Sequence, residues 1–198
     1  LTAATGMDAL THAIESYITP GAWAMSDMFE LKAIEMIAQN LKAAVDNGKD
    51  VVAREAMSQA QYIAGMGFSN VGLGIVHSMA HPLGAFYDTP HGVANALLLP
   101  YVMEYNAESS AAPKYINIAK AMGVDTTGMS EAEGVKAAIE AVKALSLSIG
   151  IPQKLHEINV KEEDIPALAV AAFNDVCTGG NPRPTSVEDI EALYHKAF

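Results

Sequence analysis

The sequence has a single cysteine, Cys177, among its 198 residues, so no internal disulfide can form. That absence fits a reducing compartment, and we expect a cytoplasmic protein. Basic residues are also scarce: 12 Lys and Arg stand against 23 Asp and Glu, for a formal net charge of -11. Because an acidic surface repels phosphate backbones, we expect no nucleic-acid partner.

Long hydrophobic runs are missing as well. No apolar run reaches the roughly 20 residues that cross a bilayer, and the start lacks the basic and then apolar pattern of a signal peptide. We therefore expect no membrane partner. Hydrophobic residues still make up 51% of the chain and charged residues 18%. This is the composition of a folded, core-rich protein rather than a disordered one.

The apolar residues recur at helical spacing nearly throughout, and no segment alternates with the period of two that is typical of strands. The fold class predicted is all-α, with one domain over residues 1–198 built as a helical bundle of one or two layers. The predicted helices cover residues 6–18, 25–45, 51–68, 75–84, 92–107, 111–121, 130–148, 162–177 and 186–197.

Several helix boundaries carry their own signals. Pro82 is predicted to end or kink its helix near His81, and Pro100 to interrupt another, because proline cannot donate a backbone hydrogen bond. Ser130 with Glu133 resembles a capping box. The chain also opens on Leu1 and almost at once enters a helix, which favours a C-terminal portion of a longer protein; a processed or trimmed chain is the alternative.

The first chemical signal is the pair Asp8 and His12. Residues four apart share one face of a helix, so the two side chains can hold one cation together. Alone this signal is weak, since such pairs are more often surface contacts.

A second signal is stronger. His77, His81 and His91 lie in an otherwise apolar, glycine-rich stretch. Buried imidazoles need a partner for each nitrogen, and a metal ion supplies one. A hydrogen-bonded core histidine is the alternative for any one of them. Three together, beside an Asp–His pair, favour a shared Fe(II) or Zn(II) site. Spacing does not say which two of the three bind the metal. The other histidines, His156 and His195, are interpreted as surface residues.

Longer motifs point the same way. Residues 6–15 (GMDALTHAIE), 72–82 (GLGIVHSMAHP) with 89–92 (TPHG), and 175–183 (DVCTGGNPR) resemble the signatures of the iron-containing alcohol dehydrogenases. The likeness runs along essentially the whole chain. Such proteins have an N-terminal α/β half that binds the dinucleotide and a helical C-terminal half that holds the metal. The chain resembles only the second half, because its glycines lack the strand–turn–helix setting of a dinucleotide fingerprint.

The resemblance implies a role for each site residue. The metal ligands would be Asp8, His12, His77 and His91. His81 would assist proton transfer, and Phe68, Leu73 and Cys177 would line the substrate or nicotinamide pocket. Cys177 has no base beside it that would favour a nucleophile, so packing is the preferred interpretation.

The resemblance also implies a function and its cofactors. It predicts NAD-linked hydride transfer on a small alcohol, diol or aldehyde, with Fe(II) or Zn(II) bound here and NAD(H) bound mainly by the N-terminal half. We expect a homo-oligomer that is inactive without that half. Two alternatives stay open: a zinc-dependent relative of glycerol dehydrogenase or dehydroquinate synthase, and a non-catalytic helical metal-binding module.

Overall fold

The computed structural model describes residues 1–198 and contains helices but no strand, which confirms the all-α prediction. The α-helices are α1 (Thr2–Ile18), α2 (Ala24–Asp46), α3 (Val51–Val71), α4 (Ile75–Tyr87), α5 (His91–Asn106), α6 (Tyr115–Ala121), α7 (Glu131–Ser148), α8 (Ile165–Phe173) and α9 (Val187–Ala197). Short 3-10 helices η1 (Ala112–Lys114), η2 (Leu155–Ile158), η3 (Glu162–Asp164) and η4 (Thr178–Gly180) connect some of them. None of these helices is both long and apolar enough to cross a membrane.

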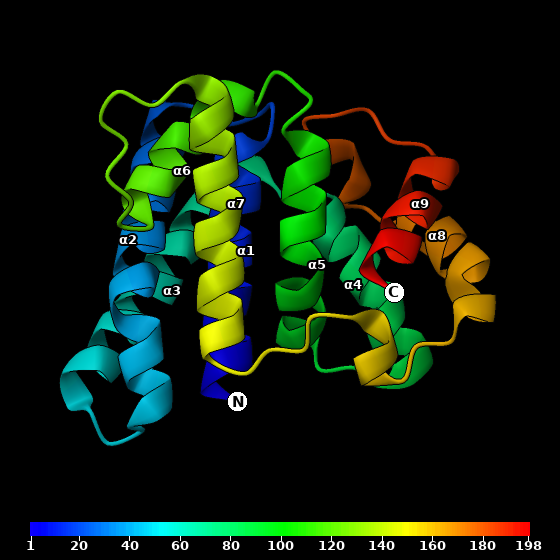
Figure 1. The fold of residues 1–198 in the computed structure, drawn as a ribbon, viewed down its shortest axis with the longest axis horizontal. Helices are drawn as coiled ribbons and strands as arrows, with labels where there is room; N and C mark the ends of the chain where they lie inside the picture. Colours follow the sequence, from blue (N-terminus) through cyan, green and yellow to red (C-terminus); the bar gives the residue numbers. More distant parts are fainter.

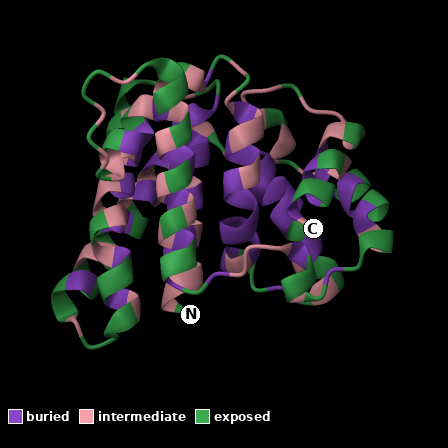
Figure 2. Cartoon of the chain, viewed as in Figure 1, coloured by how far each residue is buried: buried purple, intermediate pink, exposed green.

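Helix α1 lies at the centre of the bundle and packs against α2, α3 and α5. Helices α2 and α3 form a long pair at one end, while α8 and α9 close the other end against α4 (Figure 1). The buried side chains form one continuous core that reaches from α1 and α2 to α8 and α9. Figure 2 shows the buried residues concentrated on the central helices, with α7 presenting an exposed outer face.

Two glycines set the spacing of the helices that matter below. Gly72 has φ of 86°, a left-handed conformation that ends α3 and turns the chain into α4. Gly92 lies where α5 meets α1, and a Cβ there would fall 2.2 Å from the backbone oxygen of Ala4. Only glycine therefore allows the start of α5 to lie this close to the start of α1.

The structure differs from the predicted helices in three places, because neither proline ends its helix and the segment 162–177 is helical only in part. Helix α4 runs past Pro82 to Tyr87, and α5 runs past Pro100 to Asn106. Each proline removes one backbone hydrogen bond, but buried apolar residues on both sides hold the helix: Met79 and Leu83 around Pro82, for example, are fully buried. The segment predicted as helix 162–177 is α-helical only in α8, since the turn of η3 precedes it and Asn174 ends it.

Candidate metal centre

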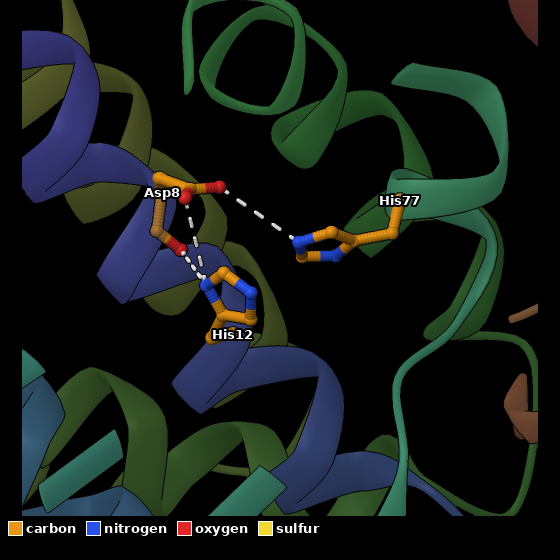
Figure 3. Close-up of side chains that lie close together, drawn as sticks. All are labelled: Asp8, His12 and His77. Atoms are coloured by element: carbon orange, nitrogen blue, oxygen red, sulfur yellow. Dashed lines mark hydrogen bonds and ion pairs between the residues drawn. The ribbon is translucent and has the colours of Figure 1, made fainter. Parts of the chain in front are cut away.

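The four predicted ligands come from three helices that converge. Asp8 and His12 lie one turn apart on α1, His77 lies in the first turn of α4, and His91 is the first residue of α5. Figure 3 shows Asp8, His12 and His77 pointing toward one another from α1 and α4. The i, i+4 spacing on α1 and the turn at Gly72 place these side chains in one space.

The distances between the side chains suit a single ion. One ligand atom each from Asp8, His12 and His77 lies within 4.8 Å of the other two. Asp8 Oδ1 is 3.8 Å from His77 Nε2 and 3.4 Å from His91 Nε2. Atoms that bind one ion at about 2.1 Å stand roughly 3 to 4 Å apart. The structure thus brings together all four residues. Asp8, His12 and His77 form one group, and His91 adjoins it by its short distance to Asp8.

The hydrogen bonds leave one ring nitrogen free on each of His12 and His77. His12 Nδ1 lies 2.8 Å from the carbonyl oxygen of Asp8 and donates to it, which leaves its lone pair on Nε2. His77 Nε2 is buried and has no partner in the protein. A buried nitrogen without a partner is costly. An ion at this place would satisfy it.

Burial lowers the pKa of two of the imidazoles, those of His12 and His91. Burial, and then the neighbouring His77, lower the pKa of His12 below its usual value. Burial also lowers the pKa of His91, against the opposing effect of Asp8. Both shifts favour the neutral imidazole, which is the form that binds a metal. The residues present therefore fit a divalent cation held by one carboxylate and three imidazoles.

One buried residue of this centre was missed from the sequence. The Asn95 side chain, fully buried on α5, donates through Nδ2 to Asp8 Oδ1 at 2.7 Å, and the same nitrogen lies 3.0 Å from His91 Nε2. It thus sits between two of the predicted ligands. The only signal was its place one turn after His91, which does not distinguish it from an ordinary core amide.

His81 borders this group, since its ring stacks on that of His91 with centroids 5.4 Å apart, and it has a hydrogen-bond partner of its own. Its Nδ1 is 2.7 Å from Asp175 Oδ2, and its side chain is 42% exposed, against 2% for His77. Although burial opposes it, hydrogen bonds from the Cys177 backbone N–H and from His81 lower the pKa of Asp175. The Asp175 carboxylate therefore fixes the His81 ring and leaves Nε2 able to exchange protons with water.

A cavity of about 640 Å³ adjoins the centre between α1 and α3, and Asp8, His12 and Phe68 are among its lining residues. The Phe68 ring stacks on His12, with ring centroids 4.5 Å apart. The other two residues predicted for the pocket, Leu73 and Cys177, do not line this cavity. Cys177 lies instead beside His81 and Asp175. Burial and the Asp175 charge raise the pKa of its thiol to about 12, so it stays protonated.

Sequence comparison relates the chain to a known family. A model of the Fe-containing alcohol dehydrogenase family, C-terminal, matches residues 2–198. The lactaldehyde reductase of Escherichia coli K12 is 62% identical over the whole chain, which covers 51% of that reductase. The 1,3-propanediol dehydrogenase of Klebsiella pneumoniae is 48% identical over the whole chain, again covering 51%. The segments at 61–74 and 164–169 also resemble lactaldehyde reductase, or propanediol oxidoreductase.

Structural comparison gives the same result. A crystal structure of 1,3-propanediol oxidoreductase superposes with a TM-score of 0.98 at 48% identity, and the match covers 100% of this chain and 52% of that one. The chain spans about half the length of the relatives it matches. With residues 2–198 fitting the family description, the chain belongs to the Fe-containing alcohol dehydrogenase family, of which it represents the C-terminal part.

Proposed function

We propose that this chain is the metal-binding half of an NAD-dependent alcohol dehydrogenase that interconverts a small alcohol or diol, such as propanediol, and an aldehyde, such as lactaldehyde. The observation that carries the proposal is the convergence of Asp8, His12, His77 and His91 from α1, α4 and α5. The relatives named above support the substrate class.

We also propose that residues 1–198 act as one helical domain, and that the remaining half of the enzyme binds the dinucleotide. Family membership supports iron as the metal, with zinc as the second choice for this donor set. An ion held here supplies Lewis-acid polarisation of the substrate oxygen, and NAD(H) supplies the hydride acceptor or donor.

In this proposal, the protein's own side chains hold the metal, line the cavity and carry the proton. Asp8 contributes a negative charge at the centre, and three neutral imidazoles complete it without adding further charge. Phe68 stacks against His12 and gives the cavity an apolar wall. His81, oriented by Asp175, can hold or release a proton at Nε2, and its partial exposure connects it to bulk water.

Substitutions at the two sets of histidines test this division. In His77→Ala or His91→Ala, bound metal should fall to background in elemental analysis, because each change removes one of four donors. His81→Ala should keep its metal and, in the enzyme completed by its dinucleotide-binding half, slow turnover on the order of 10²- to 10⁴-fold, the usual contribution of a positioned acid or base.

His195→Ala serves as the matched control, because His195 is an exposed histidine on α9, a helix that carries none of the predicted site residues. It should change neither metal content nor turnover. A normal metal content in His77→Ala would show that the ligands are assigned wrongly. Loss of metal in His81→Ala would show that a ligand has been mistaken for a proton carrier.

A further inference from the structure

Glu15 is a buried carboxylate that the proposed mechanism does not use. It lies on α1, one turn after His12, and only 2% of its side chain is exposed. Its Oε2 lies 2.5 Å from His77 Nδ1, and its Oε1 accepts a hydrogen bond of 2.7 Å from the backbone N–H of Val76. Both contacts are made to the first turn of α4.

The first contact fixes the state of the His77 ring. A carboxylate oxygen can only accept, so His77 Nδ1 must donate. The lone pair then lies on His77 Nε2, the buried atom that has no partner in the protein and that faces Asp8 Oδ1. A metal-binding histidine is commonly held by a carboxylate on its other nitrogen, which sets the tautomer and the ring orientation.

We propose that Glu15 is the positioning residue of the metal centre: it holds His77 in the tautomer and orientation that present Nε2 to the ion. This inference rests on the proposed metal site. Glu15 does not touch the ion itself and acts through His77.

The second contact fixes the position of the first turn of α4, which carries the His77 ring. The N–H groups of a helix's first turn have no partner within the helix, and the Glu15 carboxylate satisfies the one at Val76. Negative charge is also favourable at this end of a helix. Gly74 leaves room for the carboxylate, since a Cβ there would lie 3.0 Å from Glu15 Oε1. Helix α1 thus supplies two predicted ligands and also anchors the helix that carries a third.

Glu15→Gln tests the proposal with little change in shape. Its amide oxygen can still accept from Val76, but its NH₂ group would then face His77 Nδ1 and donate to it. The ring proton would have to move to Nε2, where it blocks binding of the ion. We expect the dissociation constant for Zn²⁺ or Co²⁺ to rise about 10- to 100-fold, the usual effect of removing such a partner. The visible spectrum of the Co²⁺ form should also change.

The tautomer itself gives a readout that needs no metal. In ¹⁵N NMR of the metal-free chain, His77 should carry its proton on Nδ1, and in Glu15→Gln on Nε2. Glu30→Gln is the matched control, because Glu30 is the other fully buried glutamate near α1 but contacts Ser16 rather than a predicted ligand. It should leave both the metal affinity and the His77 tautomer unchanged.

Gly74→Ala covers the case in which Glu15→Gln does not fold. The added Cβ would press on Glu15 Oε1 and on Asn181 Oδ1, and it should weaken metal binding without changing any charge. A folded Glu15→Gln that binds metal as the wild type does, or a wild-type His77 protonated on Nε2, would overturn the proposal. If the wild type bound no metal at all, the proposed function would fail, while the NMR experiment would still test Glu15.

Discussion

At the scale of single residues, Glu30 is held in its neutral form. It is fully buried on α2, and burial raises its pKa to about 8. Ser16 Oγ lies 2.5 Å from both Glu30 Oε1 and the carbonyl oxygen of His12. The hydroxyl has one proton, so if it donates to His12 it must accept from Glu30. A protonated Glu30 satisfies this chain of hydrogen bonds.

This burial makes stability depend on pH. The folded chain keeps the Glu30 proton up to a pH of about 8, whereas the unfolded chain loses it near the ordinary pKa of 4.5. The folded state therefore loses stability as the pH rises from about 4.5 toward 8, which amounts to about 3 kcal/mol at pH 7. Glu30→Gln should remove this loss because its amide is never charged.

Urea unfolding of both proteins measures the effect. The wild type and Glu30→Gln should have similar free energies of unfolding near pH 5, and the variant should be the more stable near pH 8. If the free energies of unfolding of the two proteins changed with pH in the same way, Glu30 would not be buried in its neutral form.

At the scale of helices, the proposed metal centre should depend on how closely α1 and α5 approach. Gly92→Ala places a Cβ 2.2 Å from the backbone oxygen of Ala4, which cannot move without shifting α1. Such overpacking costs about 1 to 3 kcal/mol. It should also weaken metal binding, because Asp8 and His91 lie on the two helices that are pushed apart. Thermal unfolding and Zn²⁺ titration measure both effects.

Gly65→Ala is the control for Gly92→Ala. It also changes a helical glycine to alanine, but nothing lies within 4 Å of the added Cβ. It should leave metal affinity unchanged and stabilise α3, since alanine is the better helix former by about 1 kcal/mol. Equal metal affinities for the two variants would mean that the approach of α1 and α5 does not set the site.

The helices themselves could be predicted from the sequence because apolar spacing is a local property. Pro82 and Pro100 misled the prediction because buried apolar residues on both sides of each proline keep the helix intact, and that burial is tertiary. Glu15, Asn95 and Asp175 were missed for a related reason. Their partners His77, Asp8 and His81 lie 62, 87 and 94 residues away, so no spacing along the chain indicates the pairing.

At the scale of the whole molecule, the cavity beside the proposed metal centre lies against the first residues of the chain. The cavity beside Asp8 and Phe68 is bounded by α1 and α3, and its lining includes the first residues of the chain, Leu1 and Thr2. In the proposed enzyme, a dinucleotide-binding half that precedes Leu1 would be connected at the rim of this cavity. That arrangement would bring a dinucleotide and the proposed metal centre together, as the proposed hydride transfer requires. A homo-oligomer stays a prediction.

A chimera tests this view of the whole molecule. The chain would be joined, ahead of Leu1, to the half of Escherichia coli lactaldehyde reductase that it does not match; the matched halves are 62% identical. After loading with Fe(II) without oxygen, the chimera should form NADH from NAD and propanediol, whereas the chain alone should form none. A chimera carrying His77→Ala should fold but form no NADH, since hydride transfer is slow when no metal polarises the substrate oxygen. A folded, metal-loaded chimera that oxidises no small alcohol would refute the proposed activity, while leaving the metal centre to be judged by its own titrations.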